Sequence, residues 1–141
     1  MSAAPLSAYA AAWADGAPDR LAAFWDADAF RFYKAEEVDR AFMRWDEVLG
    51  YWRGNQGMHE RVRLGFDEVR PMPLDGGWSL LWCRMRWDIR FREGQGPARA
   101  MGGWNHVLAL THGDKLAGWS ETPDAPITYL RALYEREARG V

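Results

Sequence analysis

Two stretches near the C-terminal end of the sequence carry side chains suited to acid–base chemistry. In MGGWNHVLAL, residues 101–110, the polar pair Asn105 and His106 interrupts a strand pattern. Alternation along a strand sends these two side chains to opposite faces of a sheet, so one of them should face an apolar interior. In the last expected strand, Trp119 and Glu121 share a face. A carboxyl beside tryptophan tends to have a raised pKa, which suits a general acid or base.

The remaining reactive residue types point to no other chemistry. His59 and His112 lie at expected loop or turn positions, and no metal-ligand spacing surrounds them. The single cysteine, Cys83, lies in an apolar run, which favours a buried packing thiol over a nucleophile. We therefore expect neither a metal nor an organic cofactor.

Size and composition indicate one globular domain, residues 1–141. Hydrophobic residues make up 48% and charged residues 27%, which is typical of a folded chain. The net charge is -2, and Arg61 and Arg63 alternate with apolar residues as on a solvated strand face, so a nucleic-acid partner is not expected. The first residues lack a signal-peptide pattern, and no apolar run reaches the roughly 20 residues that span a bilayer. The expectation is a cytoplasmic protein with no membrane partner.

Three helices are predicted first. Pro5 can open the first and Gly16 can close it, while Pro18 fits the first turn of a short second helix. The third is expected from about Glu36 to Gly54. Its apolar residues recur at intervals of three and four, namely Val38, Ala41, Phe42, Trp45, Val48, Leu49 and Trp52.

The pattern then changes to the period of two that is typical of strands. The expected strands are 30–33, 62–66, 78–91, 99–111 and 115–122, with Pro71 and Pro73 breaking the run after the second. Asp75 and Gly76 supply a hairpin turn. A fourth helix should open at Pro126 and dock through Ile127, Leu130, Leu133 and Tyr134. This order predicts an α+β fold in which a cone-shaped, curved antiparallel sheet packs on three N-terminal helices, with an extra C-terminal helix and a cavity between the layers.

This pattern resembles the nuclear transport factor 2-like superfamily, the α+β cone shared by ketosteroid isomerases and small polyketide cyclases. The resemblance rests on three stretches: YAAAWADGAPDRLAAFWDADAFRFY, LGYWRGN and GGWNHVLAL. The first is similar to the opening helices and first strand of that family, the second to the end of its long helix, and the third to the strand that carries its Asp-His pair.

The resemblance implies roles for individual residues. Tyr9 matches the tyrosine that donates a hydrogen bond to a substrate oxyanion, and Asn105 matches the second oxyanion donor, with His106 turned outward. Tyr33 takes the position of the aspartate base, a departure from the family, and Trp52 replaces a supporting tyrosine. Because the resemblance turns the inner face of the last strand toward the cavity, Glu121 is a candidate replacement base.

Two functions follow from this reading. One is a cofactor-independent enzyme that isomerises, cyclises, dehydrates or hydrolyses a small apolar carbonyl compound, with Tyr9, Tyr33, Asn105 and Glu121 as its catalytic residues. The other is a non-catalytic ligand-binding or dimerisation module of the same fold. The residues expected to bind the substrate are Trp13, Trp25, Trp52, Met85, Trp87 and Trp119. A cavity filled by Trp25, Trp45, Trp87 and Trp119 would favour the module.

The opposite face of the sheet is expected to hold an apolar patch. It would consist of Trp82, Trp104, His106, Leu108 and Leu110. Large apolar patches seldom stay exposed on monomers, and the helices already occupy the other face. The sequence therefore predicts a homodimer through the outer sheet face.

Overall fold

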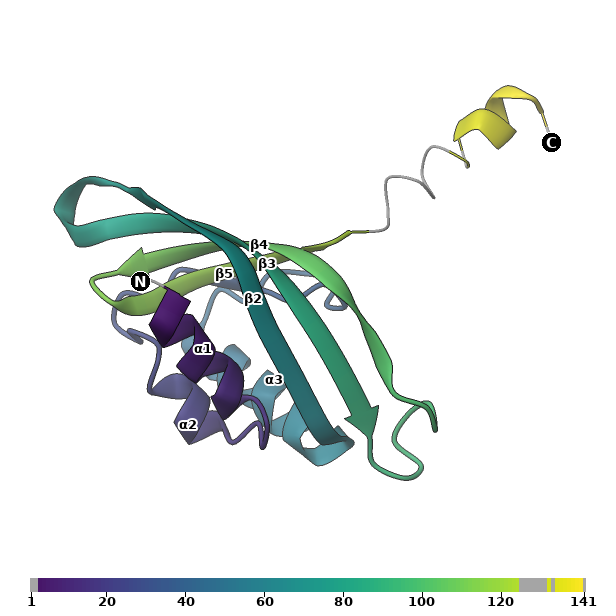
Figure 1. Ribbon diagram of the computed structural model, residues 1–141, viewed down its shortest axis with the longest axis horizontal. Coiled ribbons are helices and arrows are strands. Elements are labelled where there is room, and N and C mark those ends of the chain that lie inside the picture. Colours follow the sequence, from purple (N-terminus) through teal and green to yellow (C-terminus); the bar gives the residue numbers. More distant parts are fainter. Residues whose placement is uncertain (1–2, 125–131, 133, 141) are drawn as a thin grey trace.

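The computed structural model describes residues 3–124, 132 and 134–140 (Figure 1). Its elements are α1 (Ala3–Ala12), α2 (Pro18–Ala22), β1 (Phe32–Lys34), α3 (Trp45–Met58), β2 (His59–Pro73), η1 (Asp75–Gly77), β3 (Trp78–Phe91), β4 (Met101–His112) and β5 (Lys115–Pro123). The strands form one sheet in the order β1-β5-β4-β3-β2. Every neighbouring pair is antiparallel except β1 and β5, which run parallel.

The sheet curves strongly, and the three helices lie on its concave side (Figure 1). This arrangement confirms the predicted α+β cone. Pro18 occupies the first turn of α2, and Gly16 adopts a left-handed backbone with φ 64°, both as the sequence indicates. β3 and β4 pair with each other along almost their whole length, so they form the central ribbon of the cone.

Alternation along the strands determines which side chains reach the interior. On β3, Leu81, Cys83 and Met85 are buried, while Trp82 between them is exposed. On β4, Asn105 and Val107 are buried. Burial raises the pKa of the Cys83 thiol to about 12, which agrees with a packing role for this residue.

The long helix is shorter than predicted at its start and longer at its end. It begins at Trp45 rather than near Glu36, because the backbone of Phe42 pairs with that of Tyr33 through two hydrogen bonds of 2.9 and 2.8 Å. The first turn of α3 is capped by Glu47, whose Oε2 accepts the backbone N–H groups of Met43 and Arg44 at 3.2 Å each. Residues 36–44 therefore form a loop, and the apolar periodicity across them was misleading.

The expected break at Pro71 and Pro73 was also wrong, because β2 continues through both prolines. β2 is an edge strand, so a missing backbone N–H costs no hydrogen bond on its open side. A bulge between Asp67 and Arg70 places Glu68 at a positive φ of 51°.

Little of the expected C-terminal helix can be compared with the structure. Ile127, Leu130 and Leu133 lie outside the described residues. Residues 134–138 are helical, and the side chain of Tyr134 is 65% exposed rather than docked. Within the described residues, no helix is both long and apolar enough to cross a membrane.

Candidate active site

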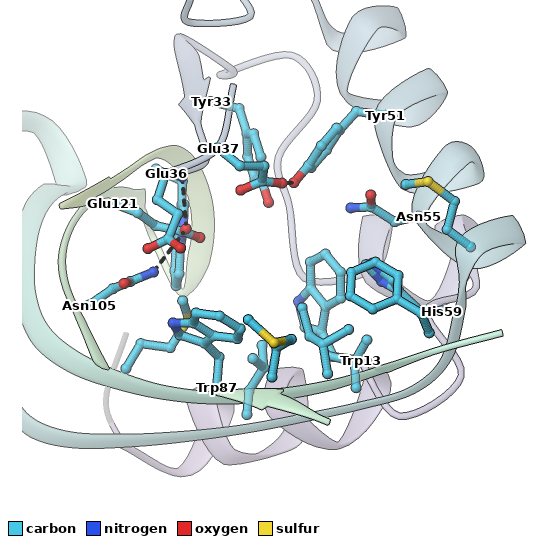
Figure 2. Close-up of a pocket in the computed structure, with 18 of the residues that line it drawn as sticks. Trp13, Tyr33, Glu36, Glu37, Tyr51, Asn55, His59, Trp87, Asn105 and Glu121 are labelled. Carbon is cyan, nitrogen blue, oxygen red and sulfur yellow. Dashed lines mark hydrogen bonds between the residues drawn. The ribbon is translucent and has the colours of Figure 1, made fainter. Parts of the chain in front are cut away.

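A cavity of about 340 Å³ lies between the concave face of the sheet and the helices (Figure 2). All four candidate catalytic residues line it, from four separate elements: Tyr9 from α1, Tyr33 from β1, Asn105 from β4 and Glu121 from β5. Four of the six expected substrate-binding residues also line it, namely Trp13, Met85, Trp87 and Trp119. Most of the remaining wall is apolar.

Trp25 and Trp52 do not line the cavity, contrary to expectation. Both are buried behind the tyrosines. The indole Nε1 of Trp25 donates to the Tyr9 hydroxyl oxygen at 3.3 Å, and that of Trp52 donates to the Tyr33 hydroxyl oxygen at 3.5 Å. These two tryptophans therefore position the tyrosine hydroxyls instead of forming the wall.

The tyrosine hydroxyls keep their own protons available. In the described part of the chain, neither the Tyr9 nor the Tyr33 O–H has an acceptor. The Tyr9 hydroxyl accepts from the indoles of Trp25 and Trp13, and the Tyr33 hydroxyl accepts from the indole of Trp52. Burial raises the pKa of both hydroxyls above the usual value for tyrosine, so they stay protonated near neutral pH. Each can donate a hydrogen bond to an oxygen atom inside the cavity.

Glu121 is held by three N–H donors. Its Oε2 accepts the backbone N–H of Glu36 at 3.1 Å and the amide Nδ2 of Asn105 at 3.3 Å, and its Oε1 accepts the indole Nε1 of Trp119 at 2.8 Å. Asn105 can reach Glu121 because Glu121 pairs with Val107, and so lies diagonally from Asn105 on the same face of the sheet. The carboxyl of Glu121 is thus fixed in orientation at one end of the cavity.

Burial raises the pKa of Glu121 to about 7, although the N–H of Trp119 and that of Glu36 act against this shift. The carboxyls of Glu37 and Glu36 raise it further. The pKa of Glu36 is raised as well, first by burial. A carboxyl that titrates near pH 7 can both take and release a proton near neutral pH, which is the property of an efficient general base.

The register predicted for the Asn-His pair is the one observed. Asn105 is only 2% exposed and faces the cavity. His106 faces outward, where its Nε2 lies 2.7 Å from Asp124 Oδ1 and its ring stacks on Trp82. A slip by one residue would have reversed these positions.

Sequence reasoning missed five polar or titratable residues of the lining: Glu36, Glu37, Tyr51, Asn55 and His59. The two glutamates were assigned to a helix that begins later, and Tyr51 was passed over for its neighbour Trp52. Tyr51 donates its hydroxyl proton to Glu37. Glu47 caps the first turn of α3, but Arg44 at the N-cap is not a usual capping residue, so no clear sequence signal assigned residues 36 and 37 to a loop.

Asn55 and His59 lie across the cavity from Glu121 (Figure 2). Burial lowers the pKa of His59, which is therefore neutral near pH 7. Among the described residues, no three His, Cys, Asp or Glu side chains are grouped closely enough to hold a metal ion.

Comparisons with known proteins define the class of fold. The chain has the nuclear transport factor 2-like fold. It matches a nuclear transport factor 2-like superfamily protein from Salmonella enterica with a TM-score of 0.72 at 8% identity, over 87% of this chain and 88% of that one. No family model and no curated protein matches the sequence.

Two further solved structures share the fold. A type 2 hexachlorocyclohexane dehydrochlorinase matches with a TM-score of 0.67 at 10% identity, over 85% of this chain and 80% of that one. A protein with a ketosteroid isomerase-like fold from Catenulispora acidiphila, solved in complex with trimethylamine, matches with a TM-score of 0.64 at 15% identity, over 89% and 88%. At these identities the comparisons establish the fold alone.

Proposed function

We propose that this protein is a cofactor-independent acid–base enzyme that acts on a small, largely apolar carbonyl compound. One observation carries the proposal: a buried carboxyl, Glu121, shares a cavity with two tyrosine hydroxyls, Tyr9 and Tyr33, whose protons have no acceptor in the described part of the chain. Removal of a proton from the carbon beside a carbonyl group requires at least a base and hydrogen-bond donors to the carbonyl oxygen, and this cavity has both.

The proposed step begins with Glu121 ionised and the carbonyl oxygen of the substrate near Tyr9 and Tyr33. Glu121 takes a proton from the carbon beside the carbonyl. The electron pair of that C–H bond forms a C=C bond, and the carbonyl pair moves onto the oxygen, which accepts hydrogen bonds from the tyrosines. Isomerisation follows when Glu121 returns the proton to another carbon, and elimination follows when a leaving group departs from the next carbon.

Asn105 has a different role in this proposal from the one that the resemblance implies. Its amide donates to Glu121, so it positions the base and stabilises the ionised carboxylate. Tyr33, which stands where the family has its base, joins Tyr9 as the second donor. Trp25 and Trp52 are positioning residues because they act only through the two hydroxyls.

A non-catalytic ligand-binding module is the second candidate. The observation in its favour is that three N–H groups already satisfy Glu121, as they would satisfy a purely structural carboxylate. Against it, Trp87 and Trp119 line the cavity but Trp25 and Trp45 do not, so half of the four tryptophans expected to fill it lie elsewhere.

Hydrogen–deuterium exchange tests the proposal without knowledge of the natural substrate. Small cyclic ketones such as 1-indanone and 2-tetralone would be incubated with the protein in D₂O, and loss of the proton signal beside the carbonyl would be followed by NMR. We expect exchange with the wild-type protein and a loss of at least about 10²-fold in Glu121→Gln. Glu93→Gln, a change of an exposed glutamate between β3 and β4, is the matched control.

Two results would count against the enzyme. Ketones that bind, with shifted indole signals, but do not exchange would support the ligand-binding module. Exchange that survives in Glu121→Gln would remove this residue from the role of base.

A further inference from the structure

The described lining of the cavity holds acidic side chains without basic ones. Three glutamates line it, Glu36, Glu37 and Glu121, and no Lys or Arg does among the described residues. Lys34 is the basic residue next to Glu36 in space, but its amino group donates to the carbonyl oxygens of Ala35 and Val38. The carboxyls therefore lack a basic partner inside the cavity.

The same cavity is rich in aromatic rings. Trp13, Trp87, Trp119 and Tyr51 line it together with the two tyrosines already described. The face of an aromatic ring carries partial negative charge and attracts cations, tryptophan most strongly. Aromatic rings, together with carboxyls that have no basic partner in the described cavity lining, favour the same kind of ligand, one that is apolar in part and positively charged.

Two buried oxygen atoms at the Glu121 end of the cavity lack hydrogen-bond donors. They are Oε2 of Glu36 and Oδ1 of Asn105. Asn105 is almost completely buried, and its amide nitrogen donates to the carboxyls of Glu121 and Glu36, so within the described residues only its oxygen lacks a partner. Buried polar groups are nearly always satisfied in native proteins, so these two oxygens call for a donor, while the unpaired Nε1 of Trp87 in the same cavity calls for an acceptor. Figure 2 shows both residues beside Glu121 on one side of the cavity.

We propose that the cavity binds a protonated amine, with its N–H at the unpaired oxygens of Glu36 and Asn105 and its alkyl groups against the tryptophans. This inference rests on the proposed function, because it names the substrate class for the same cavity: a compound that carries both a carbonyl group and a protonated amine. A positive charge on the substrate would also stabilise the negative charge that develops when Glu121 removes a proton.

Three probes of nearly equal shape test this inference. N,N-dimethylbenzylamine is protonated near neutral pH and has an N–H. Benzyltrimethylammonium is charged but has no N–H, and isobutylbenzene replaces the nitrogen of the first probe by carbon. Dissociation constants would be measured at pH 7.5 by tryptophan fluorescence and checked by NMR. We expect the amine to bind at least about tenfold more tightly than isobutylbenzene, with benzyltrimethylammonium between them.

Two variants test whether the carboxyl of Glu36 is responsible for the tighter binding of the amine. Glu36→Gln should weaken the amine at least about fivefold and leave isobutylbenzene within about twofold, while Glu93→Gln should change neither. Equal affinity of the wild-type protein for the amine and for isobutylbenzene would overturn the inference. So would no binding of the amine, or an unchanged amine affinity in Glu36→Gln.

These outcomes are separable from those of the ketone exchange. If neutral ketones exchange but the amine binds no more tightly than isobutylbenzene, the acid–base function is supported and the proposed cationic substrate is refuted. If the amine binds more tightly than isobutylbenzene but no ketone exchanges, the amine site is supported and the proposed reaction is refuted.

Discussion

The backbone N–H of Glu36 donates to Oε2 of Glu121 across 3.1 Å, although 85 positions separate the two residues in the sequence. This hydrogen bond joins the loop after β1 to the last strand of the sheet. Glu36 lies well before α3, which begins at Trp45, so its N–H has no intrahelical partner and can make this tertiary hydrogen bond. The loop brings a second carboxyl next to the candidate base, and the carboxyl of Glu36 raises the pKa of Glu121.

The first prediction concerns how the free energy of unfolding depends on pH. Glu121 has a pKa of about 7 in the folded protein and near 4.5 when unfolded. Between these pH values the folded state binds more protons than the unfolded state. The free energy of unfolding should therefore fall as pH rises from about 4.5 to 7 and stay low above pH 7. The contribution of this one group is on the order of 3 kcal/mol. Glu121→Gln removes the buried charge, so its free energy of unfolding should exceed that of the wild type at pH 8.

Urea denaturation at pH 5 and pH 8 measures this difference. Glu121→Gln should lose less stability between the two pH values than the wild type, with a remainder due to Glu36, whose pKa is also raised. Glu93→Gln should follow the wild type. A Glu121→Gln protein with the same pH dependence as the wild type would show that Glu121 titrates normally.

The second prediction concerns the tyrosine hydroxyls. Tyr9→Phe and Tyr33→Phe should each lower the ketone exchange rate about 10²–10³-fold if the hydroxyls stabilise a developing oxyanion. Tyr9→Phe loses the hydrogen bonds from the indoles of Trp25 and Trp13, and Tyr33→Phe loses the one from Trp52, so the free energy of unfolding should fall by only about 1–2 kcal/mol. Tyr134→Phe, at an exposed tyrosine, is the control. Normal exchange in both cavity variants would leave the hydroxyls without a catalytic role.

The strand portion of the site could be predicted from sequence because strand alternation is a local rule. Asn105 and His106 could be assigned to opposite faces, and the apolar period of β3 supported that register. The wall behind the tyrosines could not be predicted in the same way. Trp25 and Trp52 are aromatic like the residues that line the cavity, and only tertiary packing, such as the bridge from Trp25 to Leu116, decides that they lie behind the hydroxyls.

The loop at residues 36–44 was missed for a different reason. Val38, Ala41 and Phe42 continue the helical period of α3, so local pattern favours a helix there. The pairing of Phe42 with Tyr33 overrides this preference, and such a contact is set by tertiary structure. Glu36 and Glu37 therefore reached the cavity without any signal in their own segment.

The third prediction concerns the bulge in β2. Glu68 has a φ of 51°, a conformation that costs a residue with a Cβ roughly 1–2 kcal/mol. Glu68→Gly should relieve this strain and raise the free energy of unfolding by about 0.5–1 kcal/mol. Glu68→Ala removes the same exposed carboxyl, which lies 3.8 Å from Arg84, but keeps the Cβ. Denaturation of both variants should show a gain for glycine only; equal stabilities would show that the bulge is unstrained.

The last prediction concerns assembly through the outer face of the sheet. Trp82 and Leu108 pair across β3 and β4, and each is 37% exposed. Beside them, His106 stacks on Trp82, and the guanidinium of Arg84 lies 4.4 Å from the ring centre of Trp104. The helices occupy the concave face, so this outer patch is the apolar surface left for a second copy. We propose a two-fold dimer in which the patch packs against itself.

A charge placed in the patch should separate the two copies. In a two-fold interface each substitution appears twice, so Leu108→Glu would bury two unpaired carboxylates near the symmetry axis. Sedimentation velocity at micromolar concentration should show a dimer for the wild type and a monomer for Leu108→Glu. Leu74→Glu, at an exposed leucine in the turn between β2 and β3, is the matched control and should remain dimeric. A monomeric wild type, or a dimer that persists in Leu108→Glu, would refute assembly through this face.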